Sequence, residues 1–177
     1  MGVCHRDLSL ENVLVNDDTC KIIDMGMCLR IPYCDPNTNG ITDVAKGMHR
    51  RRLMKPQGVC GKHNYMSPEV FANTDNFDGF SIDLWAAGVI LYIMLTGFPP
   101  YDQASITDQR FELIVTGRLG EQLRNWDISL SDEAYDLMQR MLQMKPDKRL
   151  TLSEIMAHPW IVNGPVQPPA PTELLPY

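Results

Sequence analysis

The sequence predicts a mainly α-helical domain that carries a small β-hairpin near its start, an α+β arrangement. Two observations support this class. Short apolar runs at residues 13–15 and 20–23 flank the polar triplet Asn16-Asp17-Asp18, and from Ser81 onward apolar residues recur at helical spacing. The period of two gives way to a period near 3.6, which predicts strands first and helices afterwards.

The two apolar runs form the first predicted element. The run at 20–23 contains β-branched residues, and Asn and Asp are typical of the tight turn that joins two antiparallel strands. Residues 30–62 contain several Pro and Gly residues and show no steady period. We therefore expect a long loop there, and loops of such length in compact domains are usually functional or disordered.

Four helices are expected after this loop. The clearest spans 84–95, where Thr96-Gly97 and Pro99-Pro100 end the apolar pattern. Further helices are expected at 108–116, at 131–144 with Ser131 as N-cap, and at 151–157, with Pro146 and Thr151 separating the last two. Residues 1–162 should thus form one domain, followed by a Pro-rich, disordered tail at 163–177.

Composition excludes several classes of protein. The chain has 177 residues, of which 44% are hydrophobic and 21% charged, as expected of one soluble domain. A net charge of −6 argues against nucleic acid as a partner. The longest apolar run is too short to span a bilayer, so no membrane partner is expected. Five Cys without paired spacing indicate reduced thiols and an intracellular, cytoplasmic location.

A zinc site is an alternative use of the thiols. Cys60 and His63 are separated by two residues, a spacing typical of one half of such a site, while Cys28, Cys34 and His49 would have to supply the other half. The second half lacks regular spacing, so the zinc reading is the weaker one.

The residues with chemical potential are concentrated in the first part of the chain. Phosphoryl transfer needs a carboxylate that accepts the proton of the attacking hydroxyl, together with hard oxygen ligands that hold Mg²⁺ against the phosphates. Asp7 can serve as the first, and Asn12 and Asp24 as the second. Because the predicted hairpin lies between Asn12 and Asp24, both side chains can reach one ion.

These residues resemble motifs of the eukaryotic protein kinases. His5-Arg6-Asp7 with Asn12 resembles the catalytic loop, Asp24-Met25-Gly26 the metal-binding triplet, and Ser67-Pro68-Glu69 the motif that closes the activation segment. The match covers roughly residues 1–160 and is most similar to the calcium/calmodulin-dependent type of serine/threonine kinase. It implies the large lobe of a protein-kinase-like fold, with ATP and Mg²⁺ as cofactors and a protein as substrate.

The resemblance also implies roles for single residues. Asp7 would be the catalytic base, Asn12 and Asp24 would bind Mg²⁺, and Leu14 would lie under the adenine of ATP. Arg6 would clamp a phosphate on the activation segment, and Glu11 stands where the family contacts basic residues of a substrate. The alternative is that Asp24 is only a cap or turn residue.

Other motif residues should be structural. His5 belongs to this group. Asp83 is expected to accept backbone hydrogen bonds from the catalytic loop, and Glu69 and Arg149 are expected to form a buried ion pair.

Two departures from the family pattern are chemically linked. Ser9 stands where these kinases usually have a Lys that contacts the transferring phosphate, and Lys62 stands where a Thr would hydrogen-bond that Lys and the catalytic Asp. We hypothesise that the partners are exchanged, so that Lys62 supplies the ammonium and Ser9 the hydroxyl, which keeps the positive charge at the transition state. The alternative is that Lys62 is a solvated loop cation.

The activation segment between Asp24 and Glu69 is also unusual. Its phosphorylatable hydroxyls are those of Tyr33, Thr38, Thr42 and Tyr65, and none stands at the family's usual place before Cys60-Gly61. The basic cluster at 49–52 is interpreted as a solvated loop, with docking of an acidic partner or mimicry of a basic substrate as alternatives.

A kinase also needs a glycine-rich loop, a strand Lys and a helix Glu, and this sequence contains no GxG. We therefore expect a fragment that lacks the small lobe, binds Mg·ATP weakly and transfers phosphate poorly by itself. The rival function is a non-catalytic, pseudokinase-like interaction module, because a lone large lobe exposes the apolar face that a small lobe would cover. The tail, with Pro165 and Pro168, offers a weak match to an SH3-like partner.

Overall fold

The computed structural model describes residues 2–17, 19–31, 43–46 and 49–164. The chain begins with a short strand, β1 (Val3–Cys4), which pairs antiparallel with β4 (Leu29–Arg30). Between them lies the hairpin of β2 (Val13–Asn16) and β3 (Thr19–Ile22), in which Val13 pairs with Ile22 and Asn16 with Thr19. The predicted hairpin is therefore confirmed, and the β1–β4 pair closes its base.

Two short 3₁₀ helices flank this hairpin. One, η1 (Leu10–Asn12), leads into β2, and the other, η2 (Met25–Met27), follows β3. The residues that resemble kinase motifs lie on or next to these two turns. The hairpin thus brings the two turns to one end of the domain.

A second hairpin corrects the sequence analysis. Within residues 30–62, where a loop was expected, β5 (Asp43–Lys46) pairs antiparallel with β6 (His49–Arg52). The segment 43–46 shows no alternation of apolar and polar residues, so periodicity gave no signal for these strands. Their pairing rests on backbone hydrogen bonds, and only two residues separate them in the sequence, the shortest common hairpin link.

Helices form the rest of the domain. They are α1 (Pro68–Ala72), α2 (Gly79–Thr96), α3 (Gln109–Val115), α4 (Leu119–Asn125), α5 (Asp132–Met141), α6 (Leu152–Met156) and α7 (Pro159–Val162), with the 3₁₀ turns η3 (His63–Tyr65) and η4 (Pro146–Lys148). The four helices expected from periodicity are confirmed as α2, α3, α5 and α6. The expected boundary at Met144 is wrong, because α5 ends at Met141.

Helix α2 is the centre of the core. Its side chains Trp85, Val89 and Tyr92 are fully inaccessible to solvent, and residues of α3, α4 and α5 pack around them. By length and composition α2 is also apolar enough to cross a membrane. Packing on more than one side of α2 accounts for this composition, because Leu84, Ala87 and Leu91 also pack against a second buried cluster.

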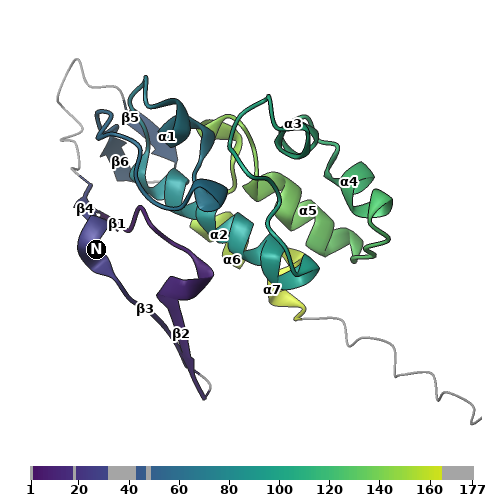
Figure 1. Cartoon of the computed structure of the whole chain (residues 1–177). Helices are drawn as coiled ribbons and strands as arrows, with labels where there is room; N and C mark the ends of the chain where they lie inside the picture. Colours follow the sequence, from purple (N-terminus) through teal and green to yellow (C-terminus); the bar gives the residue numbers. More distant parts are fainter. Residues whose placement is uncertain (1, 18, 32–42, 47–48, 165–177) are drawn as a thin grey trace, which may run out of the picture.

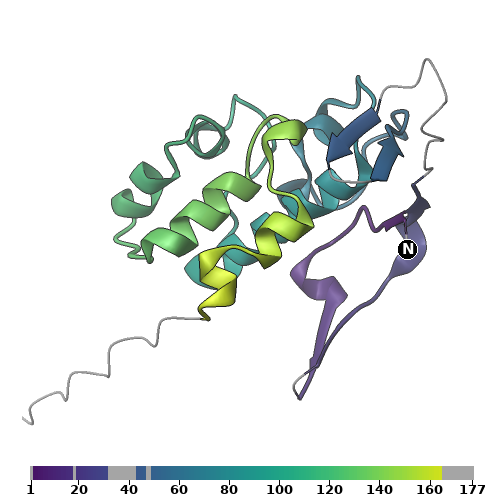
Figure 2. The ribbon, with the colours of Figure 1, turned by 180° about the vertical axis from the view of Figure 1, so that it is seen from behind.

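The fold is a helical body with a protruding hairpin. Figures 1 and 2 show that β2 and β3 extend away from the helices, while η1 and the β1–β4 pair connect them to the body. The structure agrees with a mainly α, protein-kinase-like α+β fold. The residues that resemble the catalytic loop and the metal-binding triplet lie where the hairpin meets the body.

Candidate active site

The loop that carries Asp7 is anchored to helix α2. The Asp83 carboxylate accepts the backbone N–H of His5 at 2.6 Å and that of Arg6 at 2.9 Å. Burial raises the pKa of Asp83, although the two backbone donors favour its charged form. The expected structural role of Asp83 is confirmed, and the positive φ of Arg6 shows how sharply the loop turns at this anchor.

Asp24 is positioned by the residue before it. The backbone N–H of Ile23 donates to the carbonyl of Asn12 at 2.9 Å. The carbonyl of Ile23 is 2.9 Å from Nε2 of His5, which is buried as its structural role requires. These two bonds close the base of the hairpin, and the next residue, Asp24, therefore emerges beside Asn12.

Asn12 and Asp7 form one unit. The side-chain amide of Asn12 donates to the backbone carbonyl of Asp7 at 2.8 Å and approaches its carboxylate Oδ2 at 3.4 Å. Asn12 is buried, so this bond fixes its amide. The second carboxylate oxygen, Oδ1 of Asp7, is buried and has no hydrogen-bond partner among the described residues.

Asn12 and Asp24 carry oxygen donors of the kind that a magnesium ion prefers. The Asn12 amide nitrogen is engaged with Asp7, which directs its carbonyl oxygen away from that bond. The Asp24 side chain is exposed, and one of its oxygens accepts the N–H of Gly26 at 3.3 Å in an αL turn. Carboxylate and amide oxygens are the hard ligands that Mg²⁺ prefers.

Lys62 lies against the catalytic loop. Its Nζ donates to Oγ of Ser9 at 2.9 Å and pairs with Oε2 of Glu11 at 3.1 Å. The side chain of Lys62 is 38% exposed, that of Glu11 is 62% exposed, and Ser9 is fully buried. The structure thus brings together Ser9 and Lys62, the two residues of the hypothesised exchange. Within the described part of the chain, the ion pair of this ammonium is with Glu11 and not with Asp7.

Gly61 allows the close approach of these two segments. Its φ is +88°, and a Cβ atom there would lie 2.9 Å from the carbonyl oxygen of Arg6 and 3.3 Å from Oδ1 of Asp7. Only glycine combines this backbone conformation with this contact. Sequence reasoning used Gly61 only as a motif position. It did not identify the need for a residue without a side chain next to Asp7.

Arg6 faces the segment that contains Cys60. Its Nη2 is 2.8 Å from Sγ of Cys60, and its Nη1 lies 3.4 Å from the carbonyl of Met27. The Nε atom is buried without a partner among the described residues. Of the candidate phosphorylation sites, Tyr33, Thr38 and Thr42 lie outside the described residues, whereas Tyr65 is buried in the core, and burial raises the pKa of its hydroxyl.

The expected ion pair of Glu69 and Arg149 is confirmed. Two bonds of 2.6 and 2.7 Å join them, and the side chains are 12% and 1% exposed. The guanidinium also lies over the ring of Trp85 at 4.8 Å, while the indole N–H donates to the hydroxyl of Tyr101, which donates to the carbonyl of Met66. Sequence reasoning did not assign Tyr101 a part in this hydrogen-bond network.

Three sequence-derived candidates remain, namely Leu14, the basic cluster at 49–52 and the Pro-rich tail. Leu14 lies on β2 with about half of its side chain exposed, 51%, on the hairpin beside the centre. The cluster at 49–52 occupies β6, where only the side chain of Arg52 is described, and it is exposed. The tail from Pro165 onward lies outside the described residues.

The structure gives no support for a zinc site. Cys4, Cys20, Cys28 and Cys60 are free thiols, and among the described residues no three His, Cys, Asp or Glu side chains gather as metal ligands. Cys34 lies outside the described residues, as does the side chain of His49. Cys60 instead contacts Arg6.

Comparison with known proteins places these motifs in a family. The model of the protein kinase domain matches residues 1–161. The serine/threonine-protein kinase DCLK2 of Ailuropoda melanoleuca is 34% identical over 168 residues, 94% of this chain and 19% of that protein. Calcium-dependent protein kinase 12 of Arabidopsis thaliana is 34% identical over 177 residues, which cover 98% of this chain and 31% of that protein.

A third relative agrees with these two. Calcium-dependent protein kinase 10 of Oryza sativa is 37% identical over 177 residues, 98% of this chain and 26% of that protein. The chain therefore spans about a third or less of the length of these relatives.

Proposed function

Because this chain belongs to the protein kinase family, as its match over residues 1–161 shows, we propose that it supplies the base and the metal ligands of a serine/threonine kinase. The reaction is transfer of the γ-phosphoryl group of ATP to a protein hydroxyl. The observation that carries the proposal is the hydrogen bond from the Asn12 amide to Asp7. It is supported by the backbone bond from Ile23, the residue before Asp24, to Asn12.

Asp7 is the base in this proposal. Its carboxylate accepts the proton of the substrate hydroxyl, and its backbone carbonyl holds the amide of Asn12. Asn12 and Asp24 would hold Mg²⁺, which neutralises charge on the phosphates when it is bound. Leu14, exposed on β2, would support the adenine.

Lys62 is proposed to take the place of the usual loop lysine. Its ammonium donates a hydrogen bond to Ser9 Oγ at 2.9 Å. The exchanged pair thus keeps one hydroxyl and one cation near Asp7, as the usual Lys and Thr pair of the family would. A fixed cation next to the transferring group lowers the barrier because negative charge is redistributed there. This role predicts a catalytic loss when the ammonium is removed.

The 177 residues contain no GxG, so the small-lobe parts of the ATP site must come from elsewhere, either from another segment of the same protein or from a second chain. We propose that the chain alone binds Mg·ATP weakly, and that a small lobe restores transfer. The proposed substrate is a protein with basic residues near its hydroxyl, because Glu11 presents an exposed carboxylate beside the base.

The test joins this chain behind the small lobe of calcium-dependent protein kinase 10 and measures transfer of radiolabelled phosphate from Mg·ATP to a protein substrate. We expect activity in the fusion and little in the chain alone. Asp7→Asn should lower kcat by about 10²–10⁴-fold. A fusion that folds and binds Mg·ATP but transfers no phosphate would contradict the proposal.

The Lys62 role has its own arm in this test. Lys62→Ala should lower kcat by about 10²-fold, the usual cost of losing one preorganised donor. Lys55→Ala is the matched control, because Lys55 is an exposed cation of the same segment. Equal activity of the two variants would exclude Lys62 from the reaction.

A non-catalytic interaction module remains the second candidate. It is favoured by exposed apolar side chains of the hairpin and of η2, among them Val15, Ile22 and Met25. Titration with Mg·ATP separates the two functions, because a module of this kind would not bind the nucleotide even when the small lobe is present.

A further inference from the structure

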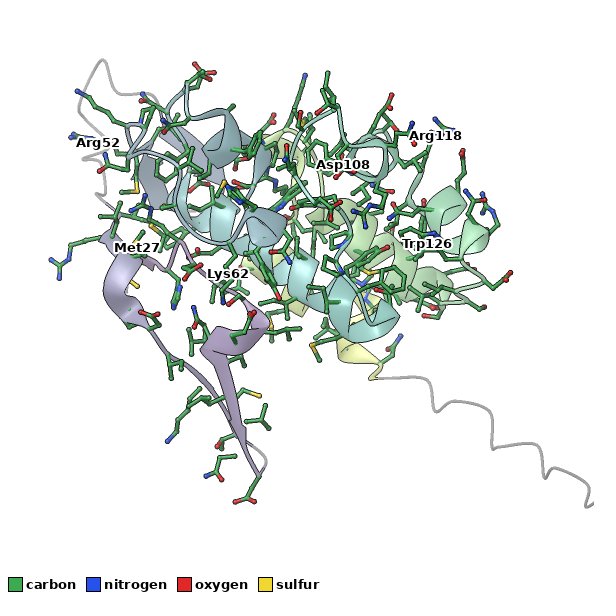
Figure 3. The ribbon with its side chains drawn as sticks, viewed as in Figure 1. Met27, Arg52, Lys62, Asp108, Arg118 and Trp126 are labelled. Carbon is green, nitrogen blue, oxygen red and sulfur yellow. The ribbon has the colours of Figure 1, made fainter. Side chains whose placement is uncertain are left out.

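The ion pair between Lys62 and Glu11 is exposed to solvent. The two side chains come from different segments, Glu11 from η1 and Lys62 from the residue before η3, and their charged atoms are 3.1 Å apart. Figure 3 shows Lys62 at the junction between the N-terminal segment and the helical body. More than half of the Glu11 side chain, 62%, is exposed, so another cation can reach the same carboxylate.

The cation that pairs with the Glu11 carboxylate is Lys62, a residue of the same chain. The Lys62 ammonium occupies one side of this carboxylate, while most of the Glu11 side chain stays open to solvent. No second acidic residue pairs with Lys62 among the described residues, so its ion pair with Glu11 is the contact that a competing cation would break.

Displacement of Lys62 from Glu11 is chemically easy. Exposed ion pairs contribute little to stability because water screens them and two long side chains lose freedom. A guanidinium binds a carboxylate through two parallel hydrogen bonds, whereas an ammonium binds it as a point charge. An arginine side chain of a bound peptide can therefore replace Lys62.

A displaced Lys62 does not leave the catalytic loop. Its ammonium also donates to Oγ of Ser9, which is fully buried. Lys62 and Asp7 line the same small cavity, of about 20 Å³, beneath the loop. Loss of Glu11 thus leaves the ammonium held by Ser9, on the side of the loop that carries the base.

We propose that Lys62 is a built-in competitor for the cation-binding carboxylate of Glu11, and that an arginine of the substrate displaces it and frees its ammonium for the phosphoryl group. The second half of this inference rests on the proposed kinase function, whereas the competition itself does not. The device couples recognition of a basic substrate to completion of the catalytic charge.

The test uses the chain itself and measures peptide binding by fluorescence anisotropy. The probes are labelled peptides in which one arginine is moved through the positions flanking a single serine, each with a twin that carries the neutral isostere citrulline. The preference, defined as the ratio of the two dissociation constants, is compared in the native chain, Lys62→Met, Glu11→Gln and the control Lys55→Met. Circular dichroism checks that each variant folds.

Lys62→Met should strengthen binding of the arginine peptide by up to about fivefold, the most that an exposed pair contributes, and leave the citrulline twin unchanged. Glu11→Gln should abolish the preference, and Lys55→Met should leave it as in the native chain. The inference is overturned if Lys62→Met leaves the preference unchanged, if Glu11→Gln retains it, or if no arginine peptide binds better than its twin in any variant.

A second readout follows Lys62 directly. In ¹⁵N NMR of the lysine ammonium groups, assigned with Lys62→Arg, the Lys62 signal should shift when the arginine peptide binds, toward its position in the free Glu11→Gln chain. A signal that does not move on saturation with peptide would also overturn the inference. Failure of phosphoryl transfer in the small-lobe fusion would instead refute the proposed function and leave these binding results intact.

Discussion

Ser67 carries a buried hydroxyl that is poorly used. Its side chain is 2% exposed, and its Oγ has no hydrogen-bond partner among the described residues. A buried polar group without a partner costs about 1–3 kcal/mol. Ser67→Ala should therefore raise the free energy of unfolding by about 1 kcal/mol, measured by urea denaturation.

A matched serine tests this explanation. Ser81 is also buried, but its hydroxyl donates to the carbonyl of Pro146 at 3.3 Å and lies 3.3 Å from Nη1 of Arg149. Ser81→Ala should destabilise the chain, in the opposite direction to Ser67→Ala. Equal losses in both variants would show that the Ser67 hydroxyl is satisfied in solution.

The ion pair of Glu69 and Arg149 predicts a large effect of a small change. Glu69→Gln keeps the shape of the side chain but removes the negative charge that pairs with the Arg149 guanidinium, which is 1% exposed. Breaking a buried pair in this way costs about 3–5 kcal/mol. Denaturation of the variant should show this loss, and a loss below about 1 kcal/mol would place the pair among surface pairs.

An exposed pair is the natural control for this measurement. Arg118 and Glu121 form two hydrogen bonds of 2.9 and 2.6 Å on the surface of α4, and Figure 3 shows Arg118 at the edge of the molecule. Glu121→Gln should leave the free energy of unfolding nearly unchanged, because water screens the charges.

At the scale of the element, helix α3 depends on the carboxylate that begins it. One oxygen of Asp108 accepts the N–H groups of Arg110 and Phe111, and the other accepts those of Asp102 and Gln103. Burial alone would raise the pKa of Asp108, but the four backbone donors outweigh it and lower the pKa below the ordinary 3.8. The cap therefore holds both the helix and the preceding loop.

The lowered pKa fixes the direction of a pH effect. A carboxylate with a depressed folded-state pKa stabilises the fold fully above pH 3.8, its ordinary value, and loses this contribution as pH falls through the folded-state value. Asp108→Asn should cost about 1–3 kcal/mol at pH 7, because the amide nitrogen cannot accept the N–H groups that the second carboxylate oxygen accepts, and this difference should shrink below pH 3.8. Denaturation at both pH values measures it, and a difference that does not depend on pH would contradict the argument.

The helices were predictable to the degree that their signals are local. Ser131 accepts the N–H of Ala134, and Thr151 and Glu154 form a capping box, so α5 and α6 begin where the sequence analysis expected. Helix α4 carries no N-cap side-chain bond, and its apolar residues are few. Its existence depends on packing against neighbours, which periodicity does not report.

The sequence prediction of the site rests on residue type and order. Asp7, Asn12 and Asp24 were proposed from the sequence; the structure joins Asn12 to Asp7 by a hydrogen bond, and the catalytic and metal-binding roles of the three residues stay predictions. The pairing of Lys62 with Glu11 was not foreseen, because Glu11 was assigned to a substrate. These residues are far apart in sequence, and no local pattern indicates which of two nearby anions a lysine side chain will meet.

At the scale of the whole molecule, the core and the hairpin are unequal. Buried residues of α2 to α5 form a continuous cluster. In contrast, the hairpin and the turn that follows it expose large apolar side chains to solvent, namely Leu14, Val15, Ile22, Ile23, Met25 and Met27. Figures 1 and 2 show no helix lying against β2 and β3. Loss of hairpin side chains should therefore change association more than folding.

Exposed apolar surface of this extent favours self-association in water. Val15 and Ile22 point to the same face of the hairpin, because Val13 pairs with Ile22 and Val15 with Cys20. The double variant Val15→Thr, Ile22→Thr keeps β-branched side chains and adds hydroxyls to this face. It should remain monomeric in sedimentation velocity at concentrations where the native chain associates, with an unchanged free energy of unfolding.

Leu152→Gln on α6, which also removes an exposed apolar side chain, should leave association as it is. If both changes reduce self-association equally, the contact between chains does not lie on the hairpin face. Fusion to a small lobe should reduce self-association only if the hairpin face causes it.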